Sequence, residues 1–507
     1  MASPETLHLQ SFQKTLSQVG GPGLPEYLSE LARLEWALSE TSDSNAIIPH
    51  EVEHTTINPT LQVLCLSWKN LTFLLGHAGK ASPEPEPGEE WVLIWREPLT
   101  NKPRSNPASN DDLLALKIVA DGIDPSEAAR GGKVSVGLID RAIDNAVHNG
   151  ILLSPKSLIR RTASCFPADA NTDERFLSSY SFTLQWHVTQ ACDLHCRHCY
   201  DRSARPTVPL GQAIRILDDL RSFCRNKRVM GAVSFTGGNP LLYPHFTHLY
   251  REAAERGFSL SILGNPCPQD QLEELIAVHE PSHFQVSLEG LPEHDDYIRG
   301  QGHFARVTEL LKVLRKLRVY SMVMLTLTKD NMDQVIPLAG MLRDMADRFH
   351  FNRLSMVGEG ANLRLPDKKE YAAFLESYSE ASKKNPIMGL KDNLINILRY
   401  RKGQELFGGC AGYGCGAAFN FLALLPDGEV HACRKFPSPV GNVYQQSIAE
   451  IYDSPAARRY RSGCRACSAC PVRPACGGCL ASAYSHGLNI FEEKDPFCFI
   501  DTYSSGD

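Results

Sequence analysis

The chain has 507 residues, of which 43% are hydrophobic and 22% charged, so it can bury several cores and is not a disordered polypeptide. Its net charge of −6 provides neither a basic field for nucleic acid nor a polybasic tract for a membrane surface. The sequence shows no signal-peptide pattern and no apolar run near the roughly 20 residues of a spanning helix, so we expect a cytoplasmic protein without nucleic-acid or membrane partners.

Cysteine usage is the unusual feature of the composition. The chain has 16 cysteines, and most of them fall into two groups with ligand-like spacing. In the absence of an export signal, clustered cysteines indicate metal or cluster ligation in a reducing compartment rather than disulfides.

The first part of the chain carries no chemical motif. Residues 1–54 are predicted to be mainly helical. Two β-rich runs follow, Leu61–Leu75 and Trp91–Trp95, and the Pro/Glu-rich stretch ASPEPEPGEE between them is predicted to be a turn.

A helical segment is predicted from Asp111 to about Gly150. One helical face is formed by Ile139, Ile143, Ala146 and Val147. We therefore expect residues 55–160 to form a small domain, and residues 161–180, which are polar, to form a linker.

From residue 181 to 403 the sequence alternates regularly between strands and amphipathic helices. The predicted strands are FTLQWHV, GAVSFTG, FSLSILG, HFQVSLEG, YSMVMLTLT and FHFNRLSMV. Six β/α units favour an α/β fold with a parallel sheet, either open or as a partial barrel. Ligand chemistry is then expected at the carboxyl ends of the strands.

Three cysteines follow the first of these strands, in the segment WHVTQACDLHCRHCYD. Cys192, Cys196 and Cys199 have the spacing x3 and then x2, which puts three thiolates on one loop. Three ligands leave one iron of a [4Fe–4S] cluster open, whereas structural sites close with four ligands. A zinc site completed by His195 or His198 is the alternative.

This loop resembles the CxxxCxxC motif of the radical S-adenosylmethionine (SAM) superfamily, and the resemblance covers about residues 181–360. It implies a partial (β/α)6 radical SAM barrel. It also implies that the open iron binds SAM and that one electron releases a 5′-deoxyadenosyl radical.

Two further segments resemble the SAM-binding parts of that family. The turn Gly237–Gly238–Asn239–Pro240 stands where the family usually has GGEP, and Asn239 replaces the carboxylate with a neutral amide. The segment VSLEGLPEHDDYIRG implies that Ser287 meets the ribose and that Arg299 meets the carboxylate of SAM. A strand-end hydroxyl and a surface arginine are the alternative readings.

The second cysteine group begins after residue 404. It contains the string Cys467-x2-Cys470-x5-Cys476-x2-Cys479, preceded by Cys415-x12-Gly428-x4-Cys433 and followed by Cys498. Such spacings wrap a metal or a cluster, and by themselves they do not separate zinc from iron–sulfur.

This group resembles the SPASM extension of radical SAM peptide maturases, which would span residues 404–507. The resemblance implies two auxiliary [4Fe–4S] clusters, and so three clusters in the whole chain. The first auxiliary cluster would be held by Cys410, Cys415, Cys433 and Cys479. The second would be held by Cys467, Cys470, Cys476 and Cys498. The role of Cys464 stays open between a ligand, a hydrogen donor and a spare cysteine at the surface.

Residues 55–160 resemble, through DGIDPSEAA and IDRAIDNAVHNGILL, the winged-helix-like recognition element that binds leader peptides of ribosomally made natural products. The physical idea is the addition of an extended leader to an exposed sheet edge. A scaffold or dimerisation domain is the alternative. The three-part layout and the segment GGNPLLYPHF are most similar to selenobiotic-family peptide radical SAM maturases.

The sequence therefore predicts a radical SAM enzyme that modifies a precursor peptide, by a crosslink, a thioether, a heterocycle or epimerisation. An electron donor such as flavodoxin or ferredoxin is implied as a partner. Formylglycine formation on a protein substrate and a non-enzymatic zinc or electron-transfer protein are the alternatives. No catalytic base can be chosen, although Asp295, Tyr297 and Glu359 are expected near the rim.

Overall fold

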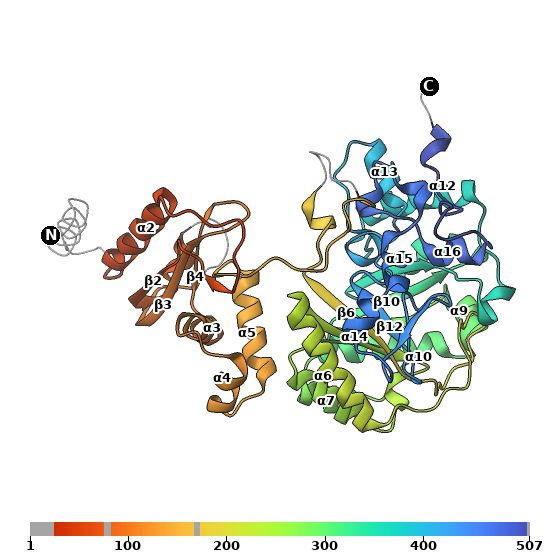
Figure 1. Cartoon of the computed structure of the whole chain (residues 1–507), viewed down its shortest axis with the longest axis horizontal. Coiled ribbons are helices and arrows are strands. Elements are labelled where there is room, and N and C mark those ends of the chain that lie inside the picture. The colour runs from red at the N-terminus through yellow and green to blue at the C-terminus, as the bar shows by residue number, and fades with distance from the viewer. Residues whose placement is uncertain (1–24, 76–82, 167–172, 504–507) are drawn as a thin grey trace. The chain divides into compact units, whose positions relative to one another are not determined.

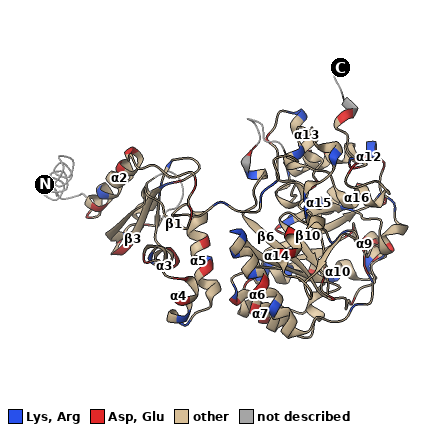
Figure 2. Cartoon of the chain, in the orientation of Figure 1, with Lys and Arg blue, Asp and Glu red and all other residues tan. Residues whose placement is uncertain are grey.

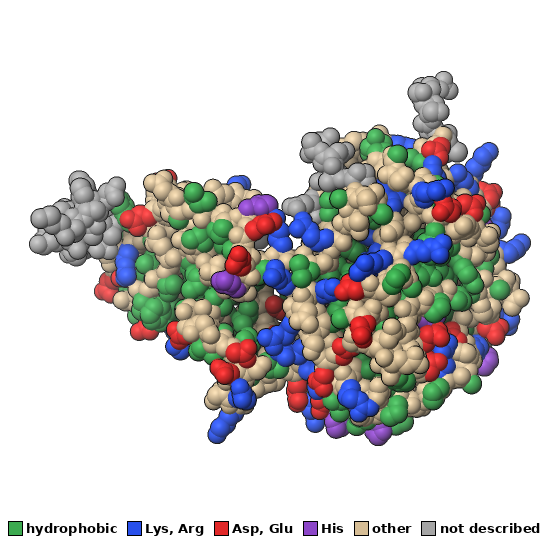
Figure 3. All heavy atoms as spheres, in the orientation of Figure 1, with side chains coloured by type: hydrophobic (Ala, Val, Ile, Leu, Met, Phe, Trp, Pro, Cys, Tyr) green, Lys and Arg blue, Asp and Glu red, His purple; other side chains and the backbone are tan. Residues whose placement is uncertain are grey.

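The computed structural model describes residues 25–75, 83–166 and 173–503 of the chain. These residues fall into two compact units, which divide between Lys156 and Ser157. Figure 1 shows both units, coloured from red at the N-terminus to blue at the C-terminus. Charges of both signs are interspersed in each unit (Figure 2) and over the face seen in Figure 3.

The first unit is a three-stranded antiparallel sheet between helices. Its sheet has the order β2-β3-β4, and a separate pair joins β1 to β5. The bounds are α2 (Leu28–Asp43), β1 (Thr56–Ile57), β2 (Gln62–Lys69), η1 (Leu71–Leu74), β3 (Glu86–Arg96), β4 (Pro103–Pro107), α3 (Asn110–Ala120), α4 (Pro125–Gly132), α5 (Val136–His148) and β5 (Leu152–Leu153).

Alternation along β3 explains why both faces of this sheet are covered. Val92 and Ile94 pack with Leu34 of α2, whereas Leu93 and Trp95 pack with α3 and α5 on the other face. A capping box between Ser109 and Asp112 begins α3.

The predicted helical segment is thus three helices, and its predicted apolar face on α5 is buried or half-buried against the core. The predicted turn was too long, because Glu86–Glu90 belong to β3; its residues 81–82 lie outside the described part.

The second unit contains all six predicted strands as one parallel series. They are β6 (Ser181–Thr189), β7 (Met230–Gly237), β8 (Ser259–Leu263), β9 (His283–Ser287), β10 (Ser321–Leu327) and β11 (Arg348–Arg353). Each pairs in parallel with the next, which confirms the α/β fold class. Apolar side chains of these strands form the largest core of the protein.

Helices connect consecutive strands and cover the sheet, as α6, α7 and α10 do in Figure 1. The bounds are α6 (Leu210–Lys227), η3 (Pro240–Leu242), α7 (Phe246–Glu255), α8 (Gln269–Val278), α9 (Pro292–Arg299), α10 (His303–Lys316), η4 (Met332–Gln334), α11 (Val335–Met341), η5 (Gly358–Asn362), α12 (Lys368–Ser382) and α13 (Ile395–Arg401).

The cysteine-rich C-terminal region joins the same sheet. Its strand β12 pairs in parallel with β6, and β13 and β14 extend the sheet further. Residues before β6 also bind this region, since the half-buried Arg161 donates to the carbonyl oxygens of Tyr413 and Cys415, each at 2.7 Å. The remaining bounds are η2 (Glu174–Phe176), η6 (Gly409–Ala411), β12 (Phe421–Leu424), β13 (Glu429–His431), β14 (Pro439–Asn442), α14 (Ile448–Asp453), α15 (Pro455–Ser462), η7 (Arg465–Cys467), η8 (Arg473–Ala475), α16 (Leu480–Ser485) and η9 (Ile500–Tyr503).

Candidate functional site

The loop after β6 carries Cys192, Cys196 and Cys199 at the carboxyl edge of the parallel sheet. Cys192 is exposed, whereas Cys196 and Cys199 are half-buried. The loop is closed by a hydrogen bond from the Cys199 N–H to the Cys196 carbonyl, at 3.2 Å. Three thiols on one short loop are a suitable ligand set for a cluster with an open iron.

The turn Gly237–Gly238–Asn239–Pro240 is bound to this loop through its backbone. The Gly238 N–H donates to the Thr189 carbonyl at 2.9 Å, and the Asn239 N–H donates to the Ala191 carbonyl at 2.7 Å. A Cβ atom on Gly237 or Gly238 would lie 2.2 Å from a carbonyl oxygen of Thr189 or Ala191. These glycines are therefore required for close approach to the cysteine loop itself.

Arg299 ends helix α9 beside the cysteine loop. Its guanidinium donates to Glu289 Oε1 at 2.6 and 2.9 Å, and its Nη1 lies 3.7 Å from Cys196 Sγ. Burial raises the pKa of Cys196, and the Arg299 charge opposes that rise. The buried cation thus favours a thiolate at Cys196. Ser287 is the last residue of β9, at the same edge of the sheet.

The three residues expected near the rim differ in their surroundings. The Asp295 carboxyl is fully buried, where it accepts from the Glu289 N–H and pairs with His303 at 2.7 Å, so its role is structural. Tyr297 is exposed and stacks with Arg197. Glu359 donates its N–H to the Cys199 carbonyl at 2.9 Å, which places it against the cysteine loop.

Two polar residues beside the loop, one buried and one half-buried, form a contact that the sequence did not predict. The Tyr200 hydroxyl lies 3.1 Å from His187 Nε2. Burial lowers the pKa of His187 to about 3 and raises that of Tyr200 to about 12, so both are neutral near pH 7. Only the position of Tyr200 directly after Cys199 could have indicated a role.

A cavity of about 50 Å³ lies in the second unit, and four thiols line it. These are Cys410, Cys415, Cys433 and Cys479, the set predicted for the first auxiliary cluster. Burial raises the pKa of Cys415 to about 11 and that of Cys433 to about 12. Apolar surroundings and four sulfurs fit a bound cluster, which would neutralise the cost of buried thiolates.

The set predicted for the second auxiliary cluster also gathers in space. Cys470 interacts electrostatically with the thiols of Cys467, Cys476 and Cys498, which come from three separate turns. Within the described residues, no three His, Cys, Asp or Glu side chains converge on a point the size of a single ion. Four thiols gathered in this way are a suitable ligand set for a cluster.

Cys464 differs from its expected place at the surface. Its side chain is only 4% exposed, and its Sγ donates to the Glu493 carbonyl at 2.9 Å. This burial excludes a surface position for Cys464, because residues 491–493 fold back over the polar segment RSGCRAC and cover it. The ligand and hydrogen-donor roles are compatible with it.

A buried ion network lies between the two C-terminal cysteine sets. Arg353, the last residue of β11, makes two 2.8 Å hydrogen bonds to the Asp495 carboxylate and a 2.9 Å ion pair with Asp392. Asp495 also accepts from the Cys479 N–H at 2.9 Å. Because the Cys498 N–H also donates to the backbone carbonyl of Asp495 at 2.9 Å, the network connects the sheet to both cysteine sets.

Arg353→Ala should destabilise the second unit by about 3–5 kcal/mol, because it leaves two carboxylates buried without their cation. Arg364→Ala is the matched control: its ion pair with Asp330 is exposed, and its loss should change stability by no more than about 1 kcal/mol. The midpoints of denaturant unfolding measure both, and equal midpoints for the two variants would contradict the structural role of Arg353.

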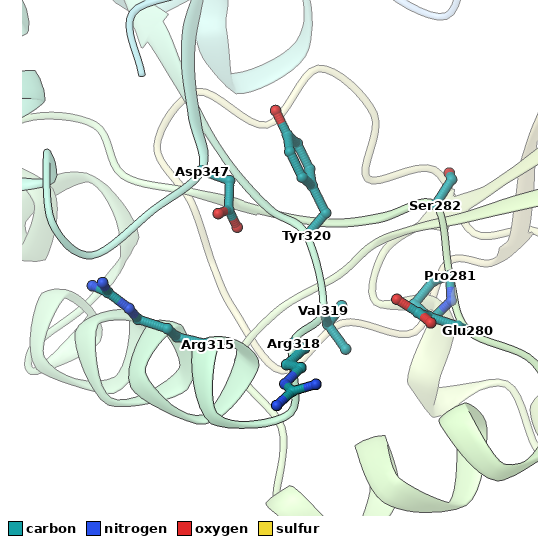
Figure 4. A pocket seen from close by; sticks show the side chains of 8 residues that line it. All are labelled: Glu280, Pro281, Ser282, Arg315, Arg318, Val319, Tyr320 and Asp347. Carbon is teal, nitrogen blue, oxygen red and sulfur yellow. The ribbon is translucent and has the colours of Figure 1, made fainter. Parts of the chain in front are cut away.

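A hollow of about 610 Å³ in the second unit lies elsewhere. Figure 4 shows Arg315, Arg318, Tyr320 and Asp347 around it. Ser282, Tyr320 and Asp347 each directly precede a strand, so this hollow is at the amino edge of the sheet, away from the cysteine loop. None of the helices in the described part of the chain is both long and apolar enough to cross a bilayer.

Comparison with known families matches two regions of the chain. The radical SAM superfamily matches residues 186–342, and the SPASM iron–sulfur cluster-binding domain matches residues 415–479. These regions contain the cysteine loop and most of the C-terminal cysteines.

Three curated relatives match about 60% of the chain. The subtilosin biosynthesis protein AlbA of Bacillus subtilis is 26% identical over 60% of this chain and 67% of its own. The AdoMet-dependent heme synthase of Methanosarcina barkeri is 24% identical over 62% of this chain and 95% of its own. The mycofactocin maturase MftC of Mycolicibacterium smegmatis is 26% identical over 62% of this chain and 82% of its own.

Among solved structures, Streptococcus suis SuiB bound to its precursor peptide SuiA has a TM-score of 0.54 at 17% identity, over 81% of this chain and 96% of that one. SuiB bound to SAM has a TM-score of 0.52 at 18% identity. The fold, the cysteine loop at the carboxyl edge of the sheet and both family matches agree: the chain is a radical SAM enzyme, with a radical SAM domain followed by a SPASM iron–sulfur cluster-binding domain.

Proposed function

We propose that this enzyme matures a ribosomally synthesised precursor peptide, abstracting a hydrogen atom from a peptide residue with a 5′-deoxyadenosyl radical. Removal of a second electron through the auxiliary clusters would then yield a crosslink, a thioether or a heterocycle, whereas return of a hydrogen would yield epimerisation. The observation that carries the proposal is the separate first unit with an open sheet edge, in the same chain as a radical SAM domain and a SPASM domain.

The comparisons support a role for that first unit in peptide binding. The match to SuiB covers 81% of this chain, which is more than the share of the chain that lies in residues 157–507. The match therefore extends into the first unit. The heme synthase, in contrast, is matched over nearly its whole length by 62% of this chain. AlbA is a bacteriocin biosynthesis protein and SuiB was solved with its precursor peptide, which supports a peptide substrate here.

The two edges of the sheet in the first unit differ in their availability. On β2, Arg33 donates to the Cys65 carbonyl at 3.0 Å and Glu30 accepts from the Ser67 N–H at 3.3 Å, so side chains of α2 occupy that edge. No hydrogen bond to the outward side of β4 occurs among the described residues. We propose β4 as the edge to which the leader adds.

The prolines of β4 limit the backbone N–H groups that this edge offers to a leader strand. The Ala108 N–H bonds to β3, and since N–H groups alternate along a strand, Pro103, Ser105 and Pro107 face outward. Proline has no N–H, so Ser105 offers the only outward donor of β4, beside outward carbonyl oxygens. Such an edge resists pairing with its own copies and still accepts a leader strand.

The site residues are assigned in the same proposal. Cys192, Cys196 and Cys199 bind the cluster that supplies the electron for SAM cleavage. Gly237, Gly238, Asn239, Pro240, Ser287 and Arg299 surround SAM. The eight C-terminal ligands hold two auxiliary clusters, giving three [4Fe–4S] clusters in all. A flavodoxin or ferredoxin reduces the enzyme, which acts in the reducing cytoplasm, where thiols stay available.

The test is an anaerobic incubation of the reconstituted enzyme with SAM, a reductant and synthetic precursor peptides encoded next to it. We expect 5′-deoxyadenosine and a peptide mass lower by two hydrogens, or an unchanged mass with an inverted residue. Turnover of a sulfatase-derived peptide at an equal rate would contradict the assignment and favour formylglycine formation.

A further inference from the structure

Asn239 leaves the turn after β7 without the carboxylate that its GGEP relatives carry. Its side chain is only 3% exposed, and both ends of the amide are engaged. Oδ1 accepts from the Leu241 N–H at 3.3 Å, and Nδ2 donates to Asp193 Oδ1 at 3.0 Å. The opposite orientation of the amide would set its oxygen against a carboxylate, so this orientation is the favourable one.

Asp193, which directly follows Cys192, receives a second amide on the same oxygen. Asn265, 8% exposed and placed after β8, donates from Nδ2 to Asp193 Oδ1 at 2.7 Å, and the same nitrogen lies 3.6 Å from Cys192 Sγ. Two neutral donors from two strand ends thus hold this carboxylate. They leave its charge uncompensated: no ion pair to Asp193 is found within the described residues.

The Asp193 carboxylate is therefore exposed, anionic and fixed in place at the cysteine loop. A cationic ligand group that binds beside Cys192 would meet it, and SAM has such a group in the ammonium of its methionine part. A charged acceptor binds an ammonium more strongly than the amide oxygen of Asn239 would.

We propose that Asp193 binds the ammonium group of SAM, in place of the carboxylate that the turn lacks, and that Asn239 and Asn265 position it. The carboxylate that would bind the ammonium group thus lies on the cysteine loop, one hydrogen bond away from Asn239 of the turn. This assignment rests on the radical SAM activity and adds the residue that recognises the amino group.

The experiment compares SAM binding by reconstituted wild-type protein, Asp193→Asn, Glu293→Gln and the double variant Asp193→Asn with Asn239→Glu. Equilibrium dialysis gives the Kd, and the change that SAM causes in the EPR spectrum of the reduced protein gives a second readout. Glu293 is an exposed acid on α9 and provides the control for one lost negative charge.

Asp193→Asn should weaken SAM binding roughly 10- to 100-fold, as expected for loss of a charge-assisted hydrogen bond, and Glu293→Gln should not. The double variant should recover most of the affinity because it restores a carboxylate on the turn. Unchanged affinity in Asp193→Asn would overturn the assignment. So would a double variant that keeps its iron but does not recover. Wild-type protein without SAM affinity would overturn the proposed function itself.

Discussion

Replacing Cys192, Cys196 and Cys199 together with Ala should abolish SAM cleavage while the C-terminal clusters remain. The three thiols lie on one loop at the carboxyl edge of the sheet, whereas the other eight predicted ligands surround the C-terminal cavity and its neighbouring turns. Iron in anaerobically reconstituted protein should fall from about 12 to about 8 atoms per chain, at four per cluster. Iron analysis and chromatographic detection of 5′-deoxyadenosine measure the two effects.

A matched triple variant makes this result specific. Cys65, Cys224 and Cys267 lie outside all three predicted ligand sets, and Cys224 is a buried core residue. Their joint replacement with Ala should leave iron content and SAM cleavage unchanged, apart from some loss of stability. If the first triple variant kept about 12 irons or still formed 5′-deoxyadenosine, the cluster would have to be bound elsewhere.

Removing residues 1–156 should impair peptide maturation severely and spare SAM cleavage without peptide. These residues have their own cores, formed between the β2-β3-β4 sheet and helices on both faces, so the fragment should fold by itself. It should bind the leader with a micromolar Kd, about −8 kcal/mol. A loss of about 3 kcal/mol of peptide-binding free energy in the shortened enzyme would lower the rate of maturation at low peptide concentration roughly 100-fold. Calorimetry on the fragment and a mass-spectrometric rate assay measure both effects.

A pair of substitutions at one position tests the docking edge. Ser105→Pro removes the last outward N–H of β4 and should weaken leader binding about tenfold, whereas Ser105→Ala keeps that N–H and should have no effect. Equal leader affinities for the two variants would contradict β4 as the strand to which the leader adds. Full maturation activity after removal of residues 1–156 would support a scaffold role for the first unit.

Local patterns in the sequence were enough to predict the parts of the molecule that depend on neighbouring residues. The alternation of apolar strands and amphipathic helices predicted all six strands of the parallel series, because each β/α unit buries its own side chains against the next. The spacing of Cys192, Cys196 and Cys199 predicted their common loop, since three residues so close in sequence share one turn.

The tertiary structure alone decided which distant groups meet. Asp193, Asn239 and Asn265 follow three different strands, and only the parallel order β6-β7-β8 brings them within hydrogen-bonding distance. The buried network of Arg353, Asp392 and Asp495 and the burial of Cys464 beneath residues 491–493 likewise join segments far apart in the chain. The hydrophobic periodicity of the sequence predicts which face of a helix or strand is buried, but not which element packs against it. Those partners are decided by packing and by the pairing of buried polar and charged groups over the whole fold.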